Sequence, residues 1–367
     1  MFLNEMRMII IISVNERNSF VPFNNRQGEK RFMARSYHKS TRWMIALLVL
    51  MIALAGCGTP QDKEVAAPSE QFTEKVGEQV AQDETKQGAG ETKVMKDEFG
   101  EVEIPVNPKR VAGIYLEDYL LALGITPVVQ WYHPSWGKQD YLGLEVPTFD
   151  ITGSVEALLE TGPDLIIVDG AVDAAKYELY SKIAPTYRLP ESILQSPPDI
   201  MKTIGDVLGI PEEAEGVLSD YHKKIEETRM KLQQAVGEET VAVLRLNVGD
   251  KTLALFGIEN RFIGNIYKEM GLTPHPFARD MTDFQAILSE EKIPELDADH
   301  IIILPSNGSW DSEENQEAMQ VFDSPLWKSV PAVKNGHVYR ADRTHWQSGA
   351  IKANMMKADD LLNWFVQ

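Results

Sequence analysis

Cysteine is almost absent from this sequence, since its 367 residues contain only one, Cys57. A single cysteine cannot form a disulfide within the chain or build a cysteine-type structural zinc site. The sequence also lacks G-x-S-x-G, H-E-x-x-H and G-x-x-x-x-G-K-S/T, and no G-x-G-x-x-G follows a predicted strand. We therefore expect a protein that is not an enzyme.

Positive charge is also scarce. Lys and Arg number 36 against 55 Asp and Glu, a net charge of −19. Without the first 56 residues, 28 basic residues stand against 52 acidic ones, a net charge of −24. Because nucleic-acid binding depends on basic patches, this balance argues against a nucleic-acid partner.

The apolar run 44–56 (MIALLVLMIALAG) is too short for a comfortable membrane span of roughly 20 residues. Basic residues precede it and small residues end it, which predicts a secretory signal over 33–56. The sequence LAGC ending at Cys57 resembles a lipobox, in which the cysteine is lipidated and becomes the new N-terminus. We therefore expect a chain lipid-anchored to the outer face of the membrane of a Gram-positive cell, with a plain membrane anchor as the alternative.

The segments on either side of this signal are not expected to fold. Residues 1–32 make the signal unusually long, and Gln27-Gly28-Glu29 can be encoded by a ribosome-binding sequence, so we expect translation to start at Met33. Residues 57–93 are polar and have almost no large apolar side chain. Such a segment cannot offset the entropy of ordering, which predicts a flexible tether.

The rest of the chain predicts an α/β fold with two lobes. In the first lobe, 94–210, strands alternate with helices, which favours a parallel sheet. A second run of the same kind fills 237–367. We expect its strands at 241–248, 252–258, 300–308 and 336–342, and a helix at 260–272.

Residues 211–236 predict one long helix between the lobes. Pro211 suits a first helical turn, two acidic residues follow it, and apolar side chains recur at helical spacing until Gly237. Twenty-six residues at about 1.5 Å each span roughly 39 Å, the width of a domain. We expect a stiff strut and only a small closure on ligand binding.

Four blocks of this body resemble the iron-siderophore substrate-binding lipoproteins of ABC importers. They are NPKRVAGIYLEDYLLALGITPVV, SVEALLETGPDLIIVD, IGDVLGIPEEAEGVLSDYHKKIEE and SPLWKSVPAVKNGHVYRAD, and they occur in the family's order. The resemblance implies the class III fold, in which one long backbone helix joins two α/β lobes. It also implies a monomer that delivers a ferric siderophore to a permease and ATPase complex, with iron(III) carried inside the siderophore and no cofactor bound directly.

Aromatic and basic side chains gather in the loops expected to face the gap between the lobes. A ferric siderophore is already fully ligated, so the protein needs flat apolar surface for the organic shell and Arg or Tyr donors for the chelating oxygens. The alternative is that several of these aromatics are core, as expected for Tyr119, Trp327 and Trp364, and that Arg188 only pairs with a carboxylate. The candidate ligand residues are Tyr115, Trp131, Tyr132, Trp136, Tyr141, Arg188, Arg245, Phe256, Arg261, Phe262, Trp310 and Trp346.

The resemblance also implies one acid in each lobe that docks on arginines of the permease. Block matching assigns these roles to Glu156 and Glu291, with Glu290 as a substitute for the latter. An acid near a helix start can instead serve only the helix dipole.

Two other ligand classes share this fold and stay open. A bare metal ion would need several histidines, and three could face the gap: His133, His275 and His345. Haem or cobalamin could take His133 or His345 as an axial ligand. Among siderophores we favour a hydroxamate over a catecholate, because a strongly anionic catecholate complex needs a tight basic cluster and the basic residues here are dispersed.

Overall fold

The computed structural model describes residues 91–366. The expected upstream segment, the signal, Cys57 and all but the last three residues of the expected tether lie outside the described residues. The described residues belong to one compact unit. No helix within 91–366 is long and apolar enough to cross a membrane.

The described chain opens with a hairpin of β1 (Thr92–Asp97) and β2 (Gly100–Pro105), paired antiparallel. The Oδ1 atom of Asp97 accepts the backbone N–H groups of Phe99 and Gly100, and Gly100 has a φ of +138°, which favours glycine. The first strand, β1, begins at Thr92, two residues before the start expected for the amino-terminal lobe at residue 94.

The amino-terminal lobe is built on short parallel strands. One sheet has the order β3-β6-β7, and β4 and β5 form a second parallel pair. Every residue of β3 and β6 is buried, as expected for strands covered on both faces. The elements of this lobe are β3 (Val111–Ile114), α3 (Glu117–Ala122), β4 (Gln130–Tyr132), η1 (Asp140–Leu142), β5 (Thr148–Asp150), α4 (Glu156–Glu160), β6 (Leu165–Val168), α5 (Ala174–Ser181), β7 (Thr186–Arg188), η2 (Glu191–Ile193) and α6 (Pro197–Leu208).

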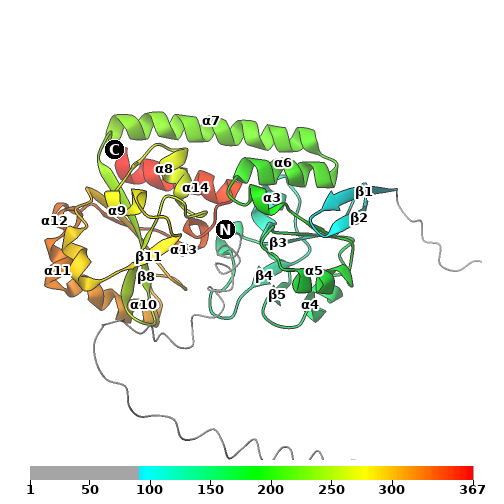
Figure 1. Ribbon diagram of the computed structural model, residues 1–367, viewed down its shortest axis with the longest axis horizontal. Helices are drawn as coiled ribbons and strands as arrows, with labels where there is room; N and C mark the ends of the chain where they lie inside the picture. The colour runs from blue at the N-terminus through cyan, green and yellow to red at the C-terminus, as the bar shows by residue number, and fades with distance from the viewer. Residues whose placement is uncertain (1–90, 367) are drawn as a thin grey trace, which may run out of the picture. The chain divides into compact units, whose positions relative to one another are not determined.

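The long helix α7 spans Pro211–Ala235, one residue short of the expected range. Its buried residues recur three or four positions apart and form one stripe. Gly205 of α6 allows a close crossing, because a Cβ there would lie 2.6 Å from Cβ of Ala214. Figure 1 shows α7 running beside both lobes, with α6 and α14 (Ile351–Phe365) packed against it.

The sheet of the carboxy-terminal lobe is mixed, which differs from the expected second parallel run. β12 pairs parallel with β8 and β13, whereas β9 is antiparallel to β8 and β11 is antiparallel to β9. Only residues 248–251 connect β8 to β9, and so short a connection permits a hairpin but not a parallel crossover. The strands are β8 (Thr240–Asn247), β9 (Thr252–Phe256), β10 (Thr273–Pro274), β11 (Gln285–Leu288), β12 (His300–Pro305) and β13 (Val338–Arg340).

The helix expected at 260–272 is also shorter in the structure. The Oδ1 atom of Asn260 accepts the backbone N–H groups of Phe262 and Ile263, so the chain turns there before α8 begins. Arg261 and Phe262 consequently lie on a turn rather than in a helix. The remaining elements are α8 (Gly264–Lys268), α9 (Pro276–Arg279), η3 (Glu290–Glu295), α10 (Glu313–Ala318), η4 (Met319–Asp323), α11 (Pro325–Ser329), α12 (Pro331–Asn335) and α13 (Arg343–Trp346).

One hydrophobic cluster extends through both lobes. It contains Val111 of β3, Leu218 of α7, Val243 of β8 and Ile351 of α14. The opposite face of each lobe's sheet packs in a cluster of its own. Because the lobes share a core, a rigid-body separation would expose apolar surface, which opposes large opening motions.

Candidate ligand-binding site between the lobes

The carboxyl ends of the parallel strands in the amino-terminal lobe carry the side chains that meet the other lobe. Ligands of open α/β sheets bind at this edge. Tyr115 follows β3, Trp131 lies in β4 and Asp169 follows β6. We call these residues and their partners across the lobes the interlobe face: Tyr115, Trp131, Trp136, Tyr141, Asp169, Arg261, Arg343 and Ser348. We add Arg245 by its position alone, because it lies two residues before the carboxyl end of β8 in the other lobe.

An ion pair connects the two sides of this face. The Nη2 atom of Arg261 lies 3.0 Å from Oδ2 of Asp169, whose side chain is 4% exposed. Burial alone would lower the pKa of the Arg261 guanidinium, but the charge and hydrogen bond of Asp169 outweigh it and raise that pKa. Asp169 also accepts the backbone N–H of Ala171, which orients its carboxylate.

Tyr141 makes a second connection. Its hydroxyl donates to Oδ2 of Asp118 at 2.6 Å and lies 3.2 Å from Oγ of Ser348 in the other lobe. Burial and the neighbouring Asp118 raise the pKa of Tyr141, so the phenol stays protonated. This expected ligand residue is therefore already bonded to both lobes.

A third connection joins Arg343 to the tight loop 133–137. The guanidinium donates to the carbonyl oxygen of Trp136, whose ring stacks on His133 at 3.7 Å between centroids. Arg343 is buried, and its Nε atom has no hydrogen-bond partner within the described chain. Burial lowers the pKa of this guanidinium. Arg343 is not among the candidate ligand residues expected from the sequence, and only the structure brings it to this face.

Tyr115 and Trp131 form the aromatic part of the face. Their ring centroids lie 5.1 Å apart, and Tyr115 has a φ of +66°, an uncommon conformation for a residue other than glycine. The Nε1 atom of Trp131 and the Oε2 atom of the adjacent Glu117 are buried, and neither has a hydrogen-bond partner among residues 91–366. Backbone strain and unpartnered buried polar atoms are both features of functional positions.

Arg245 adds a second guanidinium without an acidic partner. Its Nε atom donates to Oδ1 of Asn247 at 2.9 Å, and it lies over the ring of Phe256. Burial lowers its pKa. Within the described residues neither Arg245 nor Arg343 has a carboxylate at ion-pair distance, whereas Arg188 and Arg261 do. In so acidic a protein, these two arginines are available to an anionic group of a ligand.

Three candidate ligand residues belong instead to the interior. Phe256 is 1% exposed, and Trp346 is fully buried with its Nε1 atom bonded to Asp360. Arg188 is buried, and its guanidinium donates to Glu98 and to the carbonyl oxygens of Gly170 and Val172. Packing and internal hydrogen bonds occupy these three side chains in the structure, and a contact between them and a ligand stays a prediction.

The remaining aromatic candidates are partly exposed. Tyr132 ends β4 with 37% of its surface exposed. Phe262 packs edge-on against Phe284, and Trp310 bonds through Nε1 to the carbonyl oxygen of Ala341. Trp310 also lies under Arg340 at 5.3 Å. Tyr119 and Trp327 are buried and Trp364 is packed against the core, as expected.

The two acids assigned to permease docking are exposed. Glu156 is the first residue of α4, and Glu291 lies in the first turn of η3, beside the equally exposed Glu290. Their exposure leaves them available to a partner, and their role stays a prediction.

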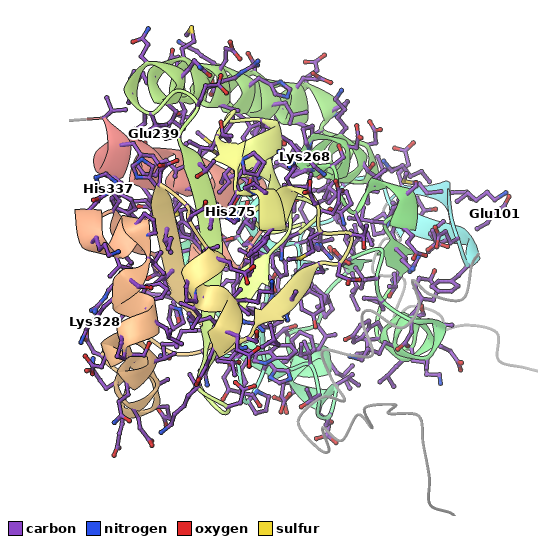
Figure 2. All side chains as sticks on the ribbon, turned by 60° about the vertical axis from the view of Figure 1, so that its left-hand side comes forward. Glu101, Glu239, Lys268, His275, Lys328 and His337 are labelled. Carbon is purple, nitrogen blue, oxygen red and sulfur yellow. The ribbon has the colours of Figure 1, made fainter. Side chains whose placement is uncertain are left out.

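The histidines of the described chain are not grouped as a metal site. Residues 91–366 contain no group of three or more His, Cys, Asp or Glu placed to hold a metal ion. His345 bonds to Asp360 at 2.7 Å and His275 bonds to Asp297 at 2.9 Å. Figure 2 shows His275 and His337 apart in the carboxy-terminal lobe, with Glu239 near the latter.

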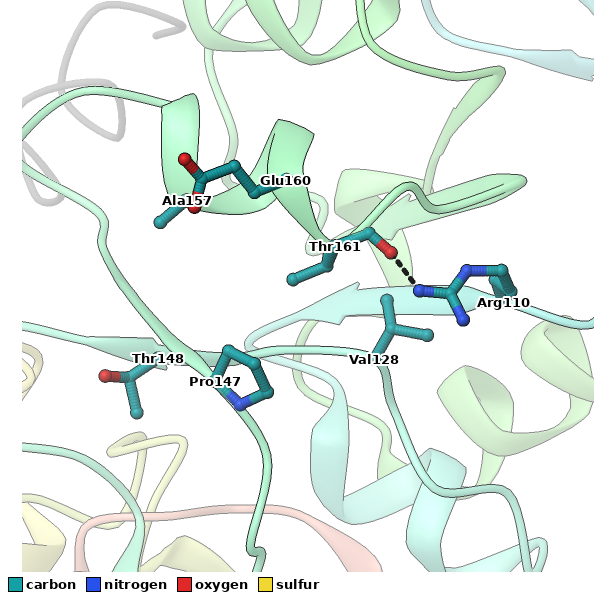
Figure 3. A pocket seen from close by; sticks show the side chains of 7 residues that line it. All are labelled: Arg110, Val128, Pro147, Thr148, Ala157, Glu160 and Thr161. Atoms are coloured by element: carbon teal, nitrogen blue, oxygen red, sulfur yellow. Dashed lines mark hydrogen bonds between the residues drawn. The ribbon is translucent and has the colours of Figure 1, made fainter.

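A hollow of about 580 Å³ lies elsewhere on the amino-terminal lobe. Figure 3 shows Arg110 at its wall, donating to the carbonyl oxygen of Thr161. Arg110 directly precedes β3 and Thr148 begins β5, so this hollow lies at the amino ends of the strands. It is therefore at the wrong edge of the sheet for the usual ligand site.

Comparison with known proteins gives consistent matches. Residues 118–344 match the family described as periplasmic binding protein. The iron(3+)-hydroxamate-binding protein FhuD of Bacillus subtilis strain 168 is 31% identical over 324 residues, covering 84% of this chain and 92% of the relative. YxeB, an iron(3+)-hydroxamate-binding protein of the same strain, is 27% identical over 260 residues, covering 69% of this chain and 78% of the relative. A solved FhuD fold-family binding protein of a Fep/Fec-like ferrichrome ABC transporter, also from Bacillus subtilis, aligns with a TM-score of 0.62 at 26% identity, over 74% of this chain and 100% of that chain.

Proposed function

This chain belongs to the periplasmic binding protein family, and from that membership we propose that it captures a ferric siderophore of the hydroxamate type between its lobes. The family assignment made from four sequence blocks is confirmed. The relatives named above are binding proteins of transport and not enzymes, in agreement with the missing catalytic motifs.

The observation that carries this proposal is the composition of the interlobe face. It combines the aromatic pair Tyr115 and Trp131 with Arg245 and Arg343, two buried or half-buried arginines that have no carboxylate partner in the described chain. Aromatic rings suit the organic shell of a siderophore, and guanidinium groups suit the negatively charged oxygens that chelate its iron. The iron is carried as cargo and needs no protein ligand.

The name of a relative favours a hydroxamate over the other ligands, because the protein at 31% identity is named for iron(3+)-hydroxamate binding. The basic residues are also dispersed along the sequence, which suits a hydroxamate better than a strongly anionic catecholate complex. Haem or cobalamin stays the alternative. Of the two candidate axial ligands, the imidazole of His345 is buried against Asp360, whereas that of His133 stacks on Trp136.

The proposal includes the partners expected of such a protein. The loaded chain would dock through Glu156 and Glu291 on an ABC permease, whose ATPase drives release. A lipid on Cys57 would keep the monomeric binding protein on the outer face of the membrane, and the segment after Cys57 would let it reach the permease.

Tryptophan fluorescence of the purified mature chain tests the ligand class. We expect saturable quenching at one site per chain by a ferric hydroxamate, and weaker quenching by the iron-free compound. Trp131→Phe should reduce the quenched amplitude, because Trp131 lies on the interlobe face. Quenching by haem or cobalamin but by no ferric siderophore would reject the proposal.

A further inference from the structure

Lys357 of α14 is a fully buried lysine without an acidic partner. Its Nζ atom donates to the carbonyl oxygens of Phe262 and Ser348 and to Oδ1 of Asn354. No carboxylate of the described chain lies within ion-pair distance of it. Burying an unpaired charge costs free energy, so the groups of the protein that contact this ammonium ion should indicate its role.

The three acceptors match the three N–H groups of an ammonium ion. A neutral amine has only two N–H groups, so loss of the proton must leave one buried oxygen without its donor. Burial lowers the pKa of Lys357 to about 7, and the negative charges of Asp118 of α3 and Glu269 after α8 only partly oppose this effect. The side chain therefore changes charge close to neutral pH.

The two carbonyl groups belong to the turns that carry the interlobe contacts. Phe262 follows Arg261, which pairs with Asp169, and the hydroxyl of Ser348 faces Tyr141. The turns are themselves in backbone contact, because a Cβ on Gly349 would lie 2.3 Å from the carbonyl oxygen of Arg261. The Lys357 ammonium group is thus hydrogen-bonded to both turns at once.

The hydrogen bonds around Lys357 extend from the interlobe face to the long helix α7. Asn354, the third acceptor, donates through Nδ2 to the carbonyl oxygen of Gly349 at 2.9 Å. The same atom lies 3.4 Å from the hydroxyl of Tyr221 in α7, which in turn donates to Glu269. Lys357 therefore links the interlobe face to the long helix that spans both lobes.

We propose that Lys357 is a positioning residue for ligand capture: its ammonium group fixes the Arg261 and Ser348 turns in the arrangement in which they meet the amino-terminal lobe. This inference rests on the proposed function, since capture takes place on that face. It predicts that ligand affinity falls as pH rises through about 7, by roughly two- to tenfold, the value of one net hydrogen bond.

The test is the affinity for a ferric hydroxamate between pH 5.5 and 8.5. We expect the fall in the wild-type chain. Lys357→Met should bind more weakly and lose this fall, keeping only the contribution of other titrating groups beside the face such as Glu117, whose pKa burial raises to about 8. Lys231→Met, whose lysine is exposed on α7, should keep the wild-type profile. Asn354→Asp places a carboxylate beside the ammonium and should move the fall to higher pH.

The outcomes separate the two proposals. A wild-type chain that binds the ferric hydroxamate with a flat profile would overturn the role of Lys357, even if the Met variant does not fold. Equal affinity and equal pH dependence in the wild type and Lys357→Met would overturn it as well. A wild-type chain that binds no ferric hydroxamate at any pH would instead reject the proposed function.

Discussion

Asp118 of the amino-terminal lobe lies with its Oδ2 atom 3.0 Å from the backbone nitrogen of Ala353 in the carboxy-terminal lobe. Its Oδ1 atom accepts the N–H of Lys352 at 2.9 Å, so one carboxylate caps the start of α14 from another part of the chain. N-caps are usually supplied from within the helix's own segment. Here the cap also holds the lobes together, so the lobes are joined at α14 as well as through α7.

We expect Asp118→Ala to lower the free energy of unfolding by about 2–4 kcal/mol, because it removes a helix cap and leaves buried donors unsatisfied. Asp173→Ala is the matched control, since Asp173 caps α5 within one lobe through the N–H of Lys176. Its loss should be about 1 kcal/mol. Urea unfolding measures both, and equal losses would mean that the contact between lobes adds nothing.

The pair of Arg261 and Asp169 should contribute a measurable coupling energy. In a double-mutant cycle of Arg261→Gln and Asp169→Asn, we expect about 1 kcal/mol, since the carboxylate is buried but the guanidinium is 30% exposed and partly screened. Unfolding free energies of the four chains give this value. Strict additivity of the two substitutions would show that the ion pair does not hold the lobes.

Glu117 should make stability fall with pH in a defined window. Burial raises its pKa from an ordinary 4.5 to about 8, so between these values the folded chain keeps a proton that the unfolded chain has lost. Glu117→Gln removes this titration while keeping an oxygen that can accept the N–H of Trp131. Between pH 5 and pH 8, the unfolding free energy of Glu117→Gln should rise by roughly 3 kcal/mol relative to that of the wild type.

Urea unfolding of both chains at the two pH values measures this difference, and other titrating groups cancel in the comparison. Exposed Glu160→Gln should show no such gain. If the difference in unfolding free energy between Glu117→Gln and the wild type is the same at both pH values, Glu117 is not held neutral.

Substitution of the exposed acids Glu156 and Glu291 should impair transport into the cell without changing ligand binding. Reversing the charges of Glu156 and Glu291 to Arg should greatly reduce ferric-hydroxamate uptake by cells while leaving affinity in solution unchanged. Glu160→Arg, in the same helix as Glu156, is the control and should keep uptake. Normal uptake in the double variant would remove these acids from the permease interface.

Much of the fold follows from local sequence. The buried strand at Leu165–Val168 and the long helix from Pro211 could be predicted because each depends on its own hydrophobic period and end signals. The antiparallel return of β9 was missed, although the short connection after Asn247 is a usable signal. The hairpin β1–β2 gives no such signal, since only Asp97 and Ile104 of its twelve residues are buried.

The site was harder to predict because residue type does not settle burial. Trp346 and Trp131 are both aromatic residues near strand ends, but α14 covers the first, whereas the second keeps an unpartnered Nε1 at the interlobe face. Arg188 and Arg245 look alike in sequence, and only the folded chain reveals that Glu98 neutralises the first. Lys357 shows no sequence signal, because one of its acceptors, the carbonyl oxygen of Phe262, lies 95 residues away in the chain and only folding brings it beside the nearby Ser348.

Calorimetric titration of the mature chain with a ferric trihydroxamate at pH 6.5 tests the central claim most directly. We predict one site per chain with a Kd below about 1 μM. Replacing Arg245 and Arg343 by Met should weaken binding by at least about tenfold, through loss of charge-assisted hydrogen bonds. Arg343→Met also removes the hydrogen bond to the carbonyl oxygen of Trp136, so urea unfolding of the double variant must show that it remains folded. Unchanged affinity in that double variant, or no binding of a ferric hydroxamate by the wild type, would contradict the account.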